Sequence, residues 1–163
     1  MSGLAAYTLF HVLLSLIGIA TGFIVIFGLI AGRWLGLWMS VFLWTTILTS
    51  VTAFFFPFKG ITPGIILGII SLVVLALSLY ALYAKKLAGG WRTTFVITAV
   101  LAEYLNFFVL IAQSFEKVPE LHALAPTGSE GPFKIAQATA LIVFVVLGFL
   151  ATKNFRHAQL QGA

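Results

Sequence analysis

The stretch that decides the fold is Trp91–Lys117, WRTTFVITAVLAEYLNFFVLIAQSFEK. It is long and apolar enough to cross a bilayer, whose hydrocarbon core of about 30 Å takes ~20 helical residues. Glu103 lies eleven residues from Arg92 and twelve from Phe115, near the middle of this span. An ionisable side chain is most costly at that depth, so a carboxyl group there predicts a functional site.

The composition of the whole chain is that of an integral membrane protein. Of its 163 residues 61% are hydrophobic and 8% are charged, whereas soluble domains carry about 25% charged residues. The spans account for almost all of the chain, which predicts a single transmembrane domain over residues 1–163. The absence of cysteine excludes disulfides and thiolate metal sites. The nine basic residues behind the net charge of +5 lie scattered at helix ends, which argues against nucleic-acid binding.

Hydropathy and helix-breaking residues predict an all-α fold, a compact bundle of five transmembrane helices. The predicted spans cover approximately residues 5–31, 35–56, 63–84, 92–115 and 134–152. Thr62 followed by Pro63 predicts an N-cap with proline at the first helical position. The pairs Gly18/Gly22 and Gly64/Gly68 predict close packing between helices, because small residues let membrane helices approach each other.

Basic residues that flank the spans predict the orientation, because cytoplasmic connections are enriched in lysine and arginine. Six lie on one side of the predicted membrane: Arg33, Lys85, Lys86, Arg92, Lys153 and Arg156. Three lie on the other: Lys59, Lys117 and Lys134. This distribution predicts an N-terminus outside and a C-terminus inside. We expect the membrane to be the bacterial inner (plasma) membrane, with membrane lipid as the immediate partner.

Polar side chains of three spans gather in the outer half of the predicted bundle. In the second span three threonines share one face at spacings of i, i+4 and i+7, and the fourth and fifth spans add carboxyl and amide groups. The candidate ligand- or proton-binding residues are Glu103, Asn106, Thr45, Thr49, Thr52, Gln113 and Gln137. They predict an outward-facing polar cleft floored by Glu103. The alternative is structural, because Ser and Thr can bond the carbonyl one turn back and amides hold neighbouring helices together.

Glu103 is predicted to be a protonatable group. Arg92 lies ~16 Å away along the helix, and burial without a nearby cation favours the neutral acid over the carboxylate. Such a group can bind a proton or a cation, or hold the polar end of an amphipathic ligand. We expect Asn106 and Thr45 or Thr49 to be its hydrogen-bond neighbours.

Four further residues are predicted at the outer mouth of the cleft: His11, His122, Glu116 and Glu120. A haem held by two histidines inside the bilayer needs two that face each other on spans, and the sequence offers no such pair. A haem held by His11 and His122 on the outer side stays open as an alternative, as does a bound quinone. The sequence predicts no metal site and no cofactor.

The connection over residues 116–133 is longer than most loops, which are functional or disordered when they exceed about 12–15 residues. It mixes prolines with apolar and polar residues, and Leu121–Ala125 could form a short helix on the membrane surface. Two interpretations stay open: a cap that controls access to the cleft, or a plain connection between helices that are not neighbours.

Three classes of function remain. The first is handling of a proton, an ion or a small solute at Glu103. The second is a non-catalytic membrane subunit of a respiratory or other multiprotein complex, in contact with lipid or quinone, within a larger assembly or a homo-oligomer. The third, catalysis on a membrane-soluble substrate, is weakest because the sequence places no second acid, nucleophile or metal set beside Glu103.

Overall fold

The computed structural model describes residues 2–57 and 60–161. The elements in this part of the chain are α1 (Gly3–Ile30), α2 (Gly36–Ala53), α3 (Pro63–Leu79), the π-helical turn η1 (Tyr80–Ala84), α4 (Trp91–Lys117), α5 (Pro119–Leu124) and α6 (Gly131–Gln161). Five helices are long and apolar enough to cross a membrane, with η1 extending α3. The predicted number of spans is therefore confirmed. Of the residues used to predict the orientation, Lys59 and the side chain of Arg156 lie outside the described residues.

Two of the helices, α1 and α3, begin at a residue whose side chain caps the first turn. Ser2 caps α1, because its hydroxyl accepts a hydrogen bond from the backbone N–H of Ala5 at 3.2 Å. Thr62 caps α3 in the same way and accepts from the N–H of Ile65 at 3.4 Å, with Pro63 in the first turn. The N-cap predicted at Thr62 is therefore confirmed.

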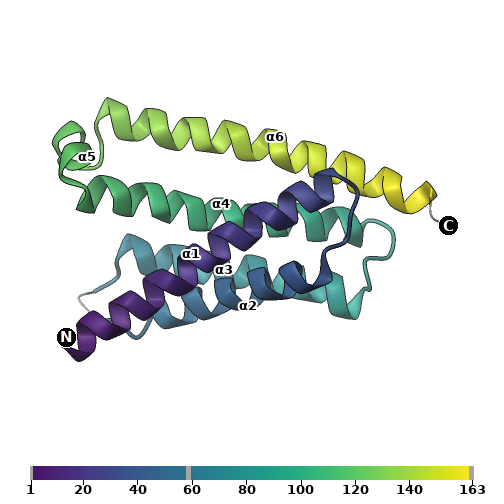
Figure 1. Ribbon diagram of the computed structural model, residues 1–163, viewed down its shortest axis with the longest axis horizontal. Helices are drawn as coiled ribbons and strands as arrows, with labels where there is room; N and C mark the ends of the chain where they lie inside the picture. Colours follow the sequence, from purple (N-terminus) through teal and green to yellow (C-terminus); the bar gives the residue numbers. More distant parts are fainter. Residues whose placement is uncertain (1, 58–59, 162–163) are drawn as a thin grey trace.

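The packing order places four helices around a common centre. Helix α1 packs against α2 and α4, and α3 also packs against α2 and α4, while α6 lies along α4 and α1 (Figure 1). The two termini lie at opposite ends of the bundle (Figure 1). We call the end that holds the N-terminus and α5 the N-terminal end, and the other the C-terminal end. Each of the five long helices runs between these two ends.

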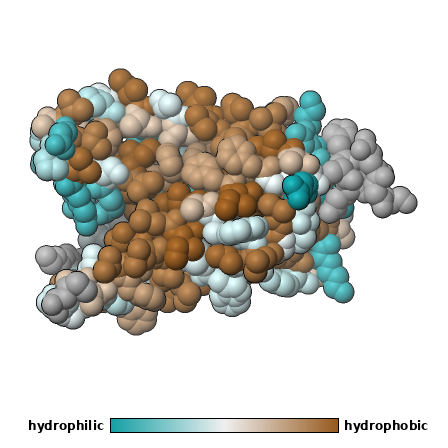
Figure 2. Space-filling view, viewed as in Figure 1, coloured by the Kyte–Doolittle hydropathy of each residue, from teal (hydrophilic) through white to brown (hydrophobic). Residues whose placement is uncertain are grey.

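The surface of the bundle is that of a protein surrounded by lipid. Figure 2 shows hydrophobic residues along the length of the molecule and hydrophilic residues gathered towards its two ends. Large apolar side chains in mid-helix are exposed, among them Trp44, Ile142 and Phe149, each at least 60% accessible. Such a surface is costly in water and favourable in a bilayer, so the five helices indicate an integral membrane protein.

The connection predicted over residues 116–133 is largely helical. Helix α4 continues to Lys117, α5 follows directly, and α6 begins at Gly131. Helices α4 and α6 pack against each other. The interpretation that this segment joins helices that are not neighbours is therefore wrong, because it is a helical turn between adjacent antiparallel helices (Figure 1).

Glu130 organises the tight turn that precedes α6. Its carboxylate accepts hydrogen bonds from the Thr127 hydroxyl at 2.7 Å and from the backbone N–H groups of Thr127 at 3.1 Å and Ser129 at 3.0 Å. These bonds, chiefly that from the Thr127 hydroxyl, lower the pKa of Glu130 to about 2 from an ordinary value of 4.5. The ionised carboxylate is thus the form that fits the turn.

We expect Glu130→Ala to increase amide hydrogen exchange of the 125–131 segment several-fold at pH 7, without change in the long helices. Because the pKa of Glu130 is lowered on folding, its stabilisation is complete above pH 4.5 and is lost as the pH falls through about 2. Exchange measured by mass spectrometry and corrected for intrinsic rates checks this. Equal protection of this segment in both chains at pH 7 would contradict the role of Glu130.

Candidate functional site

Helix α4 places Glu103 at the centre of the bundle, where its side chain is completely buried. The carboxyl group lies directly against the backbone of α1 at Gly22. A Cβ atom at Gly22 would overlap the Glu103 carboxyl group and would also lie 2.9 Å from Cε2 of Phe42 on α2. Only a glycine leaves room here, so α1 accommodates Glu103 because residue 22 has no side chain.

The Glu103 carboxyl group has no hydrogen-bond partner among the described residues, for either oxygen. Asn106, one turn along α4, interacts with the carboxyl group, although its amide lies outside hydrogen-bonding geometry. Its Nδ2, however, donates to the hydroxyl of Thr46 on α2 at 3.2 Å. Buried polar groups are nearly always bonded, so a buried carboxyl group without a partner requires an explanation.

Gly18, one turn from Gly22 on α1, accommodates the neighbouring polar groups. A Cβ atom at this position would lie 3.3 Å from the hydroxyl oxygens of both Thr45 and Thr46, and 3.7 Å from Nδ2 of Asn106. Three helices therefore meet at a set of polar side chains beside two glycines. We call this set the polar junction: Gly18, Gly22, Thr45, Thr46, Glu103 and Asn106.

A cleft of about 570 Å³ opens between α1, α2, α3 and α4 in the half of the bundle towards the N-terminal end. We call it the N-terminal cleft. Its polar lining residues are Thr8, His11, Ser15, Thr49, Ser50, Thr62, Ser71, Asn106, Gln113, Ser114 and Lys117, and most of the remaining lining is aliphatic. Asn106 belongs both to the lining and to the polar junction. The cleft and the buried carboxyl group are therefore neighbours along α4.

The floor of the cleft differs from the prediction. Glu103 is not among the residues that line the N-terminal cleft. Glu103 lies one helical turn deeper on α4 than Asn106, ~4.5 Å along the axis. Its side chain packs against Gly22 of α1 and does not line the cleft. Asn106 thus stands between the cleft and the carboxyl group.

Of the other predicted binding residues, two line the cleft and three do not. Thr49 and Gln113 are lining residues, and the buried Thr49 hydroxyl has no partner among the described residues. Thr45 belongs to the polar junction, and its hydroxyl donates to the carbonyl of Val41 at 2.7 Å. Thr52 and Gln137 are placed elsewhere. The predicted binding residues are therefore divided between the N-terminal cleft, the polar junction and positions outside both.

His11 lies at the mouth of the cleft and contacts Thr52. Its Nδ1 is 2.8 Å from the Thr52 hydroxyl, which itself donates to the carbonyl of Leu48 at 2.7 Å. Either Nδ1 of His11 or the Thr52 hydroxyl can supply the proton of this bond, depending on the tautomer of the ring. The Phe56 ring packs edge-on against His11 at 5.1 Å and Tyr7 at 5.0 Å, and also lines the cleft.

The remaining candidates lie apart from the cleft lining. Gln137 on α6 is buried, and its Nε2 donates to the carbonyl of Phe108 at 3.1 Å, which ties α6 to α4. Glu116 accepts from Gln113 at 3.4 Å, while Glu120 and His122 are exposed on α5. The 116–133 segment reaches the cleft only through its first residues, up to Val118. This leaves little support for a cap over the cleft.

Sequence reasoning missed eight polar residues that contribute to these sites. Thr46 is the partner of Asn106, and seven others line the cleft: Thr8, Ser15, Ser50, Thr62, Ser71, Ser114 and Lys117. The sequence carries a signal for two of them, because Thr46 and Ser50 are spaced i, i+4 and share one face of the second span. Both are buried in the structure. The second span, however, carries hydroxyls on two adjacent faces, and spacing alone does not tell which face is turned inward.

Beyond Glu103 towards the C-terminal end, the core is mainly apolar. It includes Val25, Ile26, Leu29, Met39, Leu43, Leu75, Phe95, Val96 and Ala99, all buried. Two buried hydroxyls lie in this region: Thr98 donates to the carbonyls of Thr94 and Phe95, and Ser78 has no partner among the described residues. Polar access to Glu103 is thus from the N-terminal end in this structure.

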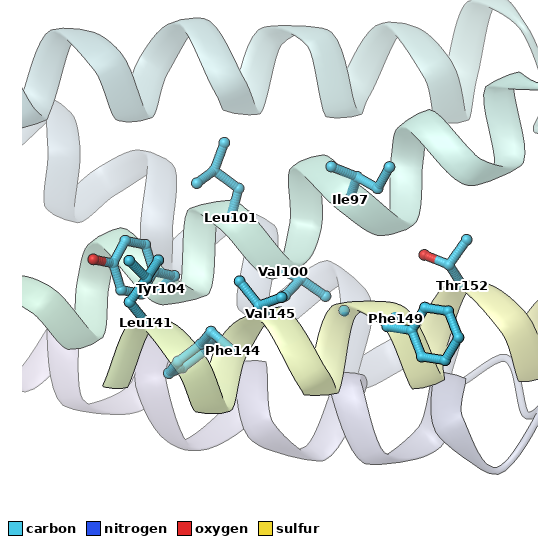
Figure 3. A pocket seen from close by; sticks show the side chains of 10 residues that line it. Ile97, Val100, Leu101, Tyr104, Leu141, Phe144, Val145, Phe149 and Thr152 are labelled. Carbon is cyan, nitrogen blue, oxygen red and sulfur yellow. The ribbon is translucent and has the colours of Figure 1, made fainter. Parts of the chain in front are cut away.

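A second hollow of about 370 Å³ lies between α4 and α6 (Figure 3). Most of its lining is aliphatic or aromatic, for example Val100, Phe144 and Phe149, and hydroxyl groups occur only at Tyr104 and Thr152. It is an apolar groove without the convergent polar groups that orient a ligand.

We expect Gly22→Ala to lower the free energy of unfolding by about 1–3 kcal/mol, because the new methyl group overlaps the Glu103 carboxyl group. Gly3→Ala is the matched control, since a Cβ atom there meets nothing within 4 Å. Combining Gly22→Ala with Glu103→Ala should recover part of the loss. Unfolding in mixed detergent micelles, followed by circular dichroism, measures this. Additive effects of the two substitutions would contradict the contact.

The arrangement combines a buried carboxyl group with an adjoining cleft whose size suits a small ligand. Among the described residues, no group of three or more His, Cys, Asp or Glu side chains is placed to hold a metal ion. The nearest polar neighbours of Glu103 are amide and hydroxyl groups, which suit hydrogen bonding rather than covalent chemistry. Comparisons of this chain with known protein families, with curated proteins and with solved structures find no match.

Proposed function

We propose that the protein binds a small solute or ion in the N-terminal cleft, with Glu103 as the protonatable group beneath it. One observation carries this proposal: the Glu103 carboxyl group is fully buried against Gly22, and neither oxygen has a partner among the described residues. An unpartnered buried polar group costs stability, and a buried carboxyl group does so more than most. Its presence is therefore better explained by function than by folding.

Access to the site is proposed to be one-sided. Hydroxyl and amide groups line the cleft towards the N-terminal end, whereas the core on the other side of Glu103 is mainly aliphatic and aromatic. The charge distribution of the sequence supports an N-terminal end outside and a C-terminal end inside. On this proposal the ligand reaches Glu103 from outside a plasma membrane, and the protein is a binding or transport protein rather than an open pore.

We propose that Glu103 changes its protonation state with the charge of the ligand in the cleft. On this proposal the carboxyl group keeps its proton while the cleft is empty, because a buried carboxylate without a cationic partner is costly. A bound cation at Asn106 would favour the carboxylate, and the proton would leave to the outer solution. On this proposal, binding of an ion and release of a proton take place at the same site.

A second candidate is a membrane subunit of a larger complex or a homo-oligomer. The observation in its favour is that α6 buries little of its apolar surface. Ile142, Val145 and Phe149 are more than 60% exposed, and the last two line the groove of Figure 3. Either lipid or a neighbouring subunit would cover such a face. Purification in a mild detergent separates the two functions, because a subunit is recovered in fixed stoichiometry with other chains.

We expect a cysteine at Ser15 to react with a charged, membrane-impermeant thiosulfonate in right-side-out vesicles but not in inside-out vesicles. Ser15 lines the cleft, and the chain has no native cysteine. Thr139→Cys on the exposed surface of α6 is the control, and it should be unreactive from both sides because lipid suppresses ionisation of the thiol. Reaction of Ser15→Cys from the inside, or from neither side, would contradict outward access.

We expect Glu103→Met to leave the free energy of unfolding unchanged or to increase it, because methionine has a similar size and no polar atom to bury. Phe42→Ala is the positive control, since loss of a fully buried ring should cost about 3–5 kcal/mol. Chemical unfolding in micelles compares the three chains. A loss comparable to that of Phe42→Ala would mean that the carboxyl group is structural, and the proposed function would fail.

A further inference from the structure

Most of the hydroxyl groups that line the N-terminal cleft are oriented as hydrogen-bond acceptors towards a ligand. Four of them donate their proton to a backbone carbonyl of their own helix, at distances between 2.7 and 3.0 Å: Thr8, Ser15, Ser50 and Ser114. A hydroxyl that has donated its only proton offers lone pairs to any further partner. Towards a ligand, these four groups are therefore acceptors.

The amide side chains add both acceptors and donors. Nδ2 of Asn106 donates to Thr46 at 3.2 Å, and Nε2 of Gln113 donates to Glu116 at 3.4 Å. In each amide one N–H is directed at the protein, which leaves the carbonyl oxygen as an acceptor and the second N–H as a donor. Asn106 lies at the deep end of the cleft, nearest to Glu103.

Donors are present in the lining as well. Lys117 at the rim is the only described lining residue with a fixed charge. The Thr62 hydroxyl accepts from a backbone N–H and keeps its own proton, and the Thr49 hydroxyl, which has no partner among the described residues, can donate or accept. The preference for a cation over an anion therefore rests on Glu103, the acidic group beneath Asn106, which attracts a positively charged donor and repels an anion. The cleft thus favours a ligand that is a positively charged donor.

The volume of the cleft and its aliphatic residues further restrict the class of ligand that it can bind. Its volume of about 570 Å³ falls within the ~300–1,000 Å³ typical of sites for organic molecules and is far larger than a bare metal ion needs. Aliphatic residues such as Leu16, Ile19, Leu105 and Val109 supply most of the surface. Glu103, one turn below Asn106, is a buried acidic group that can balance a positive charge.

We propose that the ligand of the N-terminal cleft is a small amphipathic ammonium ion that carries N–H groups. Its N–H groups bond the acceptor oxygens around Asn106 and Thr49, its apolar part contacts the aliphatic wall, and Glu103 balances its charge from beneath. This inference rests on the proposed binding function of the cleft and names the class of its ligand.

The test uses the full chain in lipid nanodiscs and isothermal titration calorimetry with four ligands of one shape. They are 4-phenylbutylammonium, its N-trimethylated analogue, 4-phenylbutanol and 4-phenylbutyrate, each corrected with protein-free nanodiscs for partition into lipid. We expect saturable binding of the ammonium ion, about tenfold or more tighter than that of the other three, because charge-assisted hydrogen bonds are roughly twice as strong as neutral ones.

Two variants separate the role of Glu103 from general effects of charge. Glu103→Gln keeps the shape and removes the charge, so the affinity for 4-phenylbutylammonium should fall by about tenfold. Glu130→Gln removes a carboxylate from the surface turn before α6, and the affinity should stay within about twofold because distant surface charges are screened. If Glu103→Gln does not fold, the four-ligand series on the native chain still decides the ligand class.

The outcomes distinguish this inference from the proposed function. Equal or tighter binding of the alcohol, the carboxylate or the trimethylated cation overturns the N–H ammonium assignment but leaves a ligand-binding cleft. No saturable binding by any of the four also overturns it, and the reactivity of Ser15→Cys then decides separately whether the cleft is reached from outside. An unchanged affinity in Glu103→Gln overturns the proposed charge balance.

Discussion

The contact between the Glu103 carboxyl group and the backbone of α1 at Gly22 determines how the centre of this bundle is built. Because residue 22 has no side chain, α1 can pass close enough to α4 to cover a carboxyl group from lipid and water. Gly18 one turn away does the same for the hydroxyls of Thr45 and Thr46. The two glycines thus create a slot for polar side chains, whereas such pairs in membranes more often let two helix backbones touch.

Much of the architecture follows from the sequence because the bilayer restricts the alternatives. A span has to be helical and about 20 residues long, which makes its hydropathy a sufficient signal for five helices. Thr62 and Pro63 mark the start of α3 through local chemistry alone. The burial of Glu103 was predictable on the same grounds, since a carboxyl group at mid-span has to face protein rather than acyl chains.

The details of the site were less predictable, because spacing gives the faces of a helix but not the direction in which each face points. In α2 two neighbouring faces carry hydroxyls, and it is Thr46 that bonds Asn106. In α6 the predicted residue Gln137 bonds the carbonyl of Phe108, because α6 packs along α4 outside the four helices that surround the cleft. Neither outcome could be derived without knowing which helices are neighbours.

The distribution of polarity along the bundle bears on whether a ligand could pass through it. Polar groups extend from the N-terminal end as far as Glu103, and beyond it side chains such as Phe42, Leu43 and Phe95 close the centre. A charged solute could cross that region only if these side chains separated, because desolvating an unpaired charge costs far more than the site could return. Binding from one side therefore requires no change in this arrangement. Transport requires a second conformation, in which the apolar parts of α1, α2 and α4 have moved apart. The contact of Glu103 with Gly22 lies at the boundary between the two halves. On the proposed function, a change in the charge of this carboxyl group would act at the place where such an opening would have to begin.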